Sequence, residues 1–213
     1  MNPLDQEDRN SLGEEQQEKK SETLQQSKDI QQSKKKSVFR HILSFVGYVV
    51  LILVLTFIIV NYVGVRTQVV GSSMYPTLEN GDNLIVEKVS YYFRDPQRFD
   101  IVVFPYPEDP DVHYIKRIIG LPGETVQIID GYVYIDGELL EEDVYGYEVM
   151  NYAGIAQDPI VLGEDEYFVL GDNRNNSEDS RFEEVGVIQG SDITGRAWIR
   201  IWPLSSFGFL GAG

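Results

Sequence analysis

The chain has 213 residues and no cysteine, and its 34 acidic against 18 basic residues give a formal net charge of −16. The lack of cysteine excludes a disulfide framework, a thiolate nucleophile and a cysteine-based zinc site. Residues 1–63 carry eight acidic and eight basic residues, so the whole imbalance, 26 acids against 10 bases, falls on residues 64–213. So acidic a segment is a poor match for phosphate contacts, and we expect no nucleic-acid partner.

The N-terminal third divides into a polar part and an apolar part. Residues 1–37 contain few large apolar side chains, a composition that predicts a disordered tail. Residues 42–63 are almost wholly apolar, and this run is as long as the ~20 residues with which a helix crosses a bilayer. A secretory signal is the alternative, but its apolar region spans about 7–15 residues before a small-residue cleavage site. We therefore predict an uncleaved transmembrane helix.

Basic residues on the two sides of this run predict its orientation. Only Arg66 follows the run closely, whereas four bases precede it: Lys34, Lys35, Lys36 and Arg40. Because positively charged flanks remain in the cytoplasm, we expect a single-pass protein of the cytoplasmic membrane. Its tail would be cytoplasmic, and residues 64–213 would form a domain on the outer face.

The predicted outer domain is mainly β. Short runs of β-branched and aromatic residues predict strands at 68–70, 83–86, 100–104, 113–120, 125–129, 132–135, 166–170 and 197–202. Asp130-Gly131 separates two of these runs and gives the clearest hairpin signal. Closely spaced short strands predict an antiparallel sheet, closed into a barrel-like form or packed as a sandwich. The acidic stretch 138–163 is expected to be an inserted loop or a small subdomain.

The stretch Gly71-Ser72-Ser73-Met74-Tyr75-Pro76-Thr77-Leu78 follows the first predicted strand of this domain. Gly71 gives the backbone conformations that other residues avoid, and Pro76 removes a backbone donor so that the chain leaves any regular ladder. Ser73 lies between them and is the candidate nucleophile. An ordinary serine-rich turn is the alternative interpretation.

A serine nucleophile needs a base that takes the proton of its hydroxyl group. His113 is the only histidine beyond the apolar run, and the next candidate is Lys116. In a strand, alternation places His113 and Ile115 on one face and Tyr114 and Lys116 on the other. Burial among the neighbouring isoleucines would lower the lysine pKa, and a neutral amine is a competent base. The alternative is a surface lysine beside Arg117.

The third polar cluster is the loop 171–181, which follows a predicted strand. Its oxygen-bearing side chains are reminiscent of a calcium loop, but counting from Asp172 places Arg174 at the third position and Ser177 where a glycine is required. We therefore expect no metal and predict a polar loop with internal Asp–Arg pairs. Such a loop would position the lysine through Ser177.

Together these stretches resemble the type I signal peptidase family, in its Gram-positive form with a single anchor. The resemblance covers most of residues 66–202 and rests on the stretches 71–78, 98–104, 114–124 and 171–181. It implies that Ser73 is the catalytic nucleophile, that Lys116 is the general base, and that no cofactor takes part. It also implies that the oxyanion hole and the shape of the site depend on Ser73, Gly71, Arg117, Asp172, Ser177, Asp179 and Arg181.

The resemblance further implies a substrate and how it binds. Secretory preproteins would be cut after their signal peptides, with small residues one and three places before the cut. The substrate would add as a β-strand beside Gln68, Val69, Val70, Gly71, Met74, Tyr114 and Ile115. One position departs from the pattern, because some members carry a serine of the oxyanion hole where this chain has Gly71. The hole would then depend on backbone N–H groups, including that of Ser73.

Two other protein classes are compatible with parts of the sequence. A LexA-type self-cleaving protease shares the serine–lysine chemistry but has no need of a membrane span. A non-catalytic, membrane-tethered β-domain would keep the span and the strands, but it would have no reason to hold Ser73, Lys116 and the loop 171–181 together.

Overall fold

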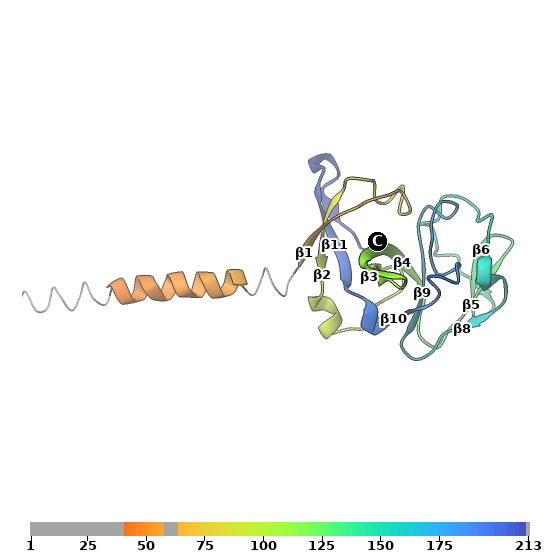
Figure 1. Ribbon diagram of the computed structural model, residues 1–213, viewed down its shortest axis with the longest axis horizontal. Helices are drawn as coiled ribbons and strands as arrows, with labels where there is room; N and C mark the ends of the chain where they lie inside the picture. Colours follow the sequence, from red (N-terminus) through yellow and green to blue (C-terminus); the bar gives the residue numbers. More distant parts are fainter. Residues whose placement is uncertain (1–40, 58–63, 212–213) are drawn as a thin grey trace, which may run out of the picture. The chain divides into compact units, whose positions relative to one another are not determined.

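The computed structural model describes residues 41–57 and 64–211 of the chain (Figure 1). The chain divides into two units, Met1–Phe57 and Ile58–Gly213. In the first unit, residues 41–57 form an α-helix. The predicted tail 1–37 and the last part of the predicted span, residues 58–63, lie outside the described residues. Within the two described ranges, the structure contains no helix with both the length and the apolar character to cross a membrane.

The second unit is mainly β, as predicted, and all its strand pairs are antiparallel. The larger sheet contains β1 (Val65–Gln68), β2 (Asn83–Glu87), β11 (Gly195–Trp202), β3 (Ile101–Tyr106), β4 (Asp109–Gly120), β9 (Glu166–Leu170) and β10 (Ile188–Gln189) in that order, with β12 (Gly208–Phe209) paired to β11. The smaller sheet contains β7 (Glu138–Leu139), β6 (Tyr132–Ile135), β5 (Thr125–Ile129) and β8 (Ile160–Val161). Figure 1 shows β5, β6 and β8 at the end of this unit opposite β1 and β2.

The strands β5, β6 and β9 were predicted with their observed bounds, and local turn chemistry explains β5 and β6. Asp130 and Gly131 join β5 to β6 with φ angles of 50° and 82°, and Asp136 and Gly137 join β6 to β7 with 52° and 84°. Two successive residues with positive φ make the tight turn whose twist suits a two-residue hairpin. The connecting 3-10 helices are short, namely η2 (Val89–Tyr92), η3 (Gly154–Gln157), η4 (Gly190–Asp192) and η5 (Leu204–Ser206).

The bounds of the other five predicted strands were wrong, by one or two residues for β2, β3 and β11 and by more for β1 and β4. The strand expected at 68–70 is β1, which ends at Gln68 because its partner β2 begins opposite that residue, at Asn83. The chain then turns at Gly71, whose φ is +98°. The strand expected at 113–120 is β4, which begins at Asp109 because it forms a hairpin with β3. The exposed tip of that hairpin carries no apolar pattern that marks it as a strand.

The core of the second unit consists of three clusters of buried apolar residues. One lies beneath the segment that carries Ser73 and includes Met74, Leu78 and Leu84. Another joins the two sheets and brings Met150, Ala156 and Leu162 against Val126, Ile128, Val133, Phe168 and Leu170. The stretch 138–163 therefore contributes to the core of the smaller sheet. The third packs β3, β4 and β9 against Val185 and Ile188.

We expect Gly120→Ala to lower the free energy of unfolding by about 1–3 kcal/mol, because the junction of the two sheets has no room for a methyl group. An added Cβ would lie 2.5 Å from Val126 Cγ2 and 2.8 Å from Leu162 Cδ1. Urea unfolding measures the loss. Gly211→Ala is the control, since a Cβ there meets nothing within 4 Å. Equal stability of the two variants would contradict this packing.

Candidate active site

Ser73 and Lys116 come together although 43 residues separate them in the chain. Lys116 Nζ lies 3.1 Å from Ser73 Oγ and also donates to the carbonyl oxygen of Ile115 at 3.2 Å. Lys116 sits on β4, where the backbone pairing with Val102 of β3 fixes its position. A lysine side chain in this arrangement is within reach of the proton on the serine hydroxyl group.

The segment that carries Ser73 is held from both sides. Met74 is 1% exposed and belongs to the core cluster beneath it. The Leu78 backbone N–H donates to Met74 O at 2.8 Å, and the Gly71 N–H donates to Asn80 Oδ1 at 3.0 Å. These contacts fix the backbone on either side of Ser73, so the hydroxyl group is presented from a rigid turn.

Burial lowers the pKa of Lys116 to about 8, against an ordinary value of 10.5, because desolvation disfavours the ammonium form. Asp179 and Glu178 act in the opposite direction through their charges. The side chain is 4% exposed, and its Nζ lies 4.7 Å from the centre of the Tyr114 ring. The predicted burial and the predicted common face of Tyr114 and Lys116 are both confirmed.

The loop 171–181 lies directly behind Ser73. The backbone N–H of Asn173 donates to Ser73 O at 3.0 Å, and its side-chain amide donates to Ser72 O at 3.0 Å. The Asn176 amide donates to Ser72 Oγ at 2.9 Å. No role was predicted for either asparagine, since neither bears a reactive group and only the fold brings them to the serine segment.

Two buried ion pairs stabilise this loop. Arg181–Asp179 is internal to the loop, as predicted, whereas Asp172 pairs with Arg117 of β4. Arg117 donates to both carboxylate oxygens of Asp172 at 2.8 and 2.7 Å, and Arg181 donates to both of Asp179 at 2.7 and 2.9 Å. All four side chains are at most 2% exposed. Since both carboxylates already face an arginine, neither is free to bind a cation. Among the described residues, no group of three acidic or histidine side chains forms a metal site.

Ser177 is the one predicted site residue whose hydroxyl group has no partner. Its Oγ is buried without a hydrogen bond among the described residues. The position where a Cβ on Gly171 would lie is in contact with this Oγ and is 2.5 Å from Ser73 O. Gly171 thus permits the serine segment and Ser177 to approach the same strand end. A buried hydroxyl group without a partner costs free energy. The structure shows no hydrogen bond between it and Lys116, through which the loop was expected to act.

A groove of about 730 Å³ leads to Ser73 and Lys116. One wall is formed by residues 65–74 and the other by residues 111–116. β1 is an edge strand, and β9 pairs with β4 only along residues 117–120, so both walls present unpaired strand edges. All the predicted substrate-binding residues line this groove: Gln68, Val69, Val70, Gly71, Met74, Tyr114 and Ile115. His113 also lines it.

A serine hydroxyl group beside a buried lysine amine, at the end of a groove with free strand edges, is the arrangement of a serine peptidase. The family profile described as "Signal peptidase, peptidase S26" matches residues 42–202. The chain belongs to this family and is a serine endopeptidase of the signal peptidase I type, as its resemblance to known members implied. The alternative of a non-catalytic β-domain is thereby set aside.

Two relatives from different organisms agree with this membership. A signal peptidase I of Leptolyngbya laminosa is 43% identical over 166 residues, which cover 72% of this chain and 79% of that protein. A signal peptidase I S of Bacillus subtilis (strain 168) is 37% identical over 183 residues, covering 81% of this chain and 94% of that protein. A solved signal peptidase I from Enterococcus faecalis V583 is 37% identical with a TM-score of 0.41, covering 48% of this chain and 97% of that chain.

We expect Lys116→Met to be at least as stable as the wild type near neutral pH. The folded pKa of about 8 lies below the ordinary 10.5, so between these values the unfolded chain binds more protons and wild-type stability rises with pH. Below this window the wild type carries the full penalty, about 3 kcal/mol at about 1.4 kcal/mol per pKa unit. Thermal unfolding across pH measures the difference, which should vanish above the window. A variant clearly less stable at neutral pH would instead make Lys116 a charged structural partner.

Proposed function

We propose that this chain removes N-terminal signal peptides from secretory preproteins by a serine–lysine mechanism at the outer face of the cytoplasmic membrane. The observation that carries the proposal is the 3.1 Å approach of Ser73 Oγ to Lys116 Nζ, an amine that burial brings to a pKa of about 8. A sizeable fraction of such an amine is neutral at mildly alkaline pH, which a general base requires.

The reaction proceeds in two halves on these two residues. Ser73 Oγ attacks the scissile carbonyl carbon while neutral Lys116 accepts the hydroxyl proton, and the resulting ammonium group gives that proton to the leaving amine. A water molecule then attacks the ester of the acyl-enzyme, with Lys116 again accepting a proton. Collapse of the second intermediate releases the new carboxyl end of the signal peptide and returns the proton to Ser73 Oγ.

The substrate binds in the groove as an added strand. Its backbone pairs with the free edges of residues 65–70 and 111–116, which gives affinity without reading the side chains. Alternate side chains of an extended strand point the same way, so the residues one and three places before the cut face the same wall. Val69, Met74 and Ile115 line the groove, and Val69 and Met74 are almost fully buried. Because this surface is closely packed, we propose that it accommodates small substrate side chains at these two positions.

The remaining predicted site residues have supporting roles. Because Gly71 offers no hydroxyl group, the backbone N–H of Ser73 is the proposed donor to the oxyanion. The unpartnered hydroxyl group of Ser177 is proposed to accept a hydrogen bond from Lys116 during the reaction. The ion pairs Arg117–Asp172 and Arg181–Asp179 hold the loop that carries Ser177.

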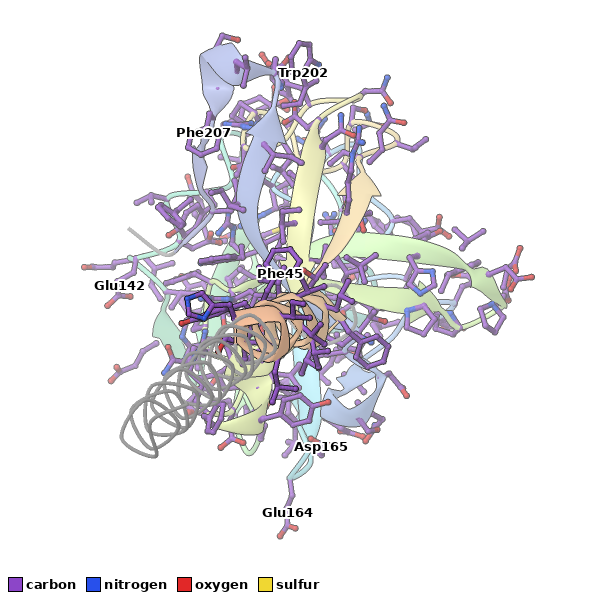
Figure 2. All side chains as sticks on the ribbon, turned by 90° about the vertical axis from the view of Figure 1, so that its left-hand side faces the viewer. Phe45, Glu142, Glu164, Asp165, Trp202 and Phe207 are labelled. Atoms are coloured by element: carbon purple, nitrogen blue, oxygen red, sulfur yellow. The ribbon has the colours of Figure 1, made fainter. Side chains whose placement is uncertain are left out.

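The lipid bilayer is the second proposed partner. We propose that residues 42–63 anchor the chain, with residues 1–37 in the cytoplasm and residues 64–213 outside. The apolar composition of 42–63 supports this. The second unit also carries an aromatic tip, which we define as Trp198, Trp202, Leu204, Phe207 and Phe209, each between 38% and 71% exposed. Figure 2 shows Trp202 and Phe207 projecting at the same end of the unit.

Aromatic side chains of this kind favour the boundary between lipid and water. The tip is built by β11, β12 and η5, and the Trp198 and Phe209 rings lie 5.7 Å apart across the β11–β12 pair. So many exposed apolar side chains on one tip are a liability in water. Contact with the membrane surface would cover them and bring the groove to the level where a signal peptide leaves the bilayer.

We expect Ser73→Ala to abolish cleavage of a preprotein, because among the described residues Ser73 carries the hydroxyl group to which Lys116 Nζ is hydrogen-bonded. Ser72→Ala is the matched control and should retain substantial activity, since Ser72 Oγ only accepts a hydrogen bond from Asn176. His113→Ala should likewise keep most activity. Gel shift of the processed product measures all three. Equal loss in both serine variants would mean that the nucleophile is misassigned, and loss in His113→Ala would favour a histidine base.

We expect the double variant Trp202→Ser/Phe207→Ser to slow cleavage of a preprotein in vesicles about tenfold, equivalent to about 1.4 kcal/mol of membrane contact. Cleavage of a short soluble peptide should remain at the wild-type rate, because the groove is untouched. Tyr132→Ser/Val161→Ser is the control, as it removes exposed apolar side chains of the smaller sheet. If the vesicle reaction ran at full rate, the aromatic tip would have no part in membrane binding.

A further inference from the structure

The segment 143–151, within the stretch that the sequence marks as an insert, contacts the catalytic loop 171–181 at several points. Asp143 forms an ion pair with Arg174 at 2.6 Å, and the two side chains are 6% and 4% exposed. The Asn151 backbone N–H donates to Asn175 Oδ1 at 2.9 Å, and Asn175 donates in turn to Val149 O at 3.0 Å. An inserted loop without a role in the site has no need of a buried ion pair to that site.

Arg174 connects Asp143 to the backbone beside Ser73 through hydrogen bonds. Its Nε donates to Gly171 O at 3.1 Å, and its own carbonyl oxygen accepts a 2.6 Å hydrogen bond from Arg181. Gly171 packs against Ser73 O and the Ser177 hydroxyl group. The Arg174 side chain, which Asp143 holds in place, therefore connects the segment 143–151 to Gly171. At Gly171 the segment that carries Ser73 and the loop 171–181 meet.

Two tyrosines of the same segment reach the site independently. The centre of the Tyr145 ring lies 3.6 Å from the guanidinium carbon of Arg117. This arginine forms the ion pair with Asp172 and follows Lys116 on β4. The Tyr147 hydroxyl group donates to Asn173 Oδ1 at 3.3 Å, and the same amide side chain holds Ser72 O. The Tyr147 ring also meets Tyr75 edge to face, with centroids 5.9 Å apart.

We propose that the segment 143–151 is a positioning brace for the reaction, with Asp143 as its principal residue, acting through Arg174 on the loop behind Ser73. Asp143 does not touch the substrate or the reacting atoms. Its role is to keep Ser73 Oγ and Lys116 Nζ at reaction distance, so its loss should lower the rate of the bound substrate while binding is conserved. This inference deepens the proposed function and rests on it.

The principal test is Asp143→Asn in the full-length chain, measured with a peptide that spans a signal-peptide cleavage site. The amide keeps the size of the side chain and removes its charge. We expect kcat per active site to fall about tenfold or more, since small displacements of catalytic groups cost up to about a hundredfold. KM should stay within about threefold, because the printed contacts of Asp143 and Arg174 do not involve the strand edges 65–70 and 111–116, with which the substrate is proposed to pair. The acyl-enzyme burst counts the active sites.

Glu142→Gln is the matched control, because it makes the same chemical change one residue away. Glu142 is exposed and points away from the unit (Figure 2), so this variant should behave as the wild type. Gly146→Ala is the second test. A Cβ there would lie 2.6 Å from Arg174 Nη1 and 2.7 Å from its Cζ, so it displaces the arginine without changing a charge. Gly211→Ala controls for the added methyl group.

The Asp143–Arg174 ion pair is also tested by a double-mutant cycle. Arg174→Gln should lower kcat as Asp143→Asn does, and the double variant should be no slower than the slower single variant. If Asp143→Asn does not fold, Gly146→Ala decides. Wild-type kcat in a folded variant would overturn the brace, and so would a loss confined to thermal stability and the number of active sites. Failure of the proposed function is distinct, since it would show as a Ser73→Ala protein that still cleaves.

Discussion

Removal of the Lys116 amine from water is the constraint on which the rest of the site depends. A lysine in solvent is protonated at neutral pH, and desolvation lowers the pKa of this one to about 8, as its proposed role as a base requires. That burial requires a β4 that is packed on both faces and a serine segment that closes over the amine. It also limits how much negative charge can stand nearby, because each carboxylate favours the ammonium form. Asp179 can lie near the amine because its negative charge is paired with the positive charge of Arg181.

The buried charges of the site form one connected system. Arg117, Arg174 and Arg181 come from two separate parts of the chain, and each is paired with a carboxylate. Ion pairs of this kind add little stability compared with apolar packing, but breaking one leaves a buried charge without a partner. Such pairs are suited to fixing geometry. The catalytic loop has almost no apolar core of its own, and these pairs together with the asparagine hydrogen bonds define its conformation.

Features that depend on neighbouring residues, such as turns, could be predicted from the sequence. Features that depend on residues far apart in the chain, such as strand ends and ion pairs, could not. Asp130-Gly131 between two β-branched runs is a strong local signal for a tight turn, so β5 and β6 were predicted residue by residue. The end of β1 is set by where Asn83 begins β2, which no residue near Gln68 reveals. The pairing of Ser73 with Lys116 was inferred from family resemblance, since nothing local links them. Asp143 was one acid among many in its stretch, and only the fold selects Arg174 as its partner.

The order of the strands has a consequence for the substrate. In the path β1-β2-β11-β3-β4 each neighbour is antiparallel, so β1 and β4 run in the same direction and face each other across the groove. In the proposed complex, a single substrate strand between them would pair with both edges and turn these five strands into a closed ring of six. Without substrate, this ring is open between β1 and β4. Cleavage at Ser73 would divide the added strand and open the ring again, so the proposed chemical step would itself weaken the binding of the product.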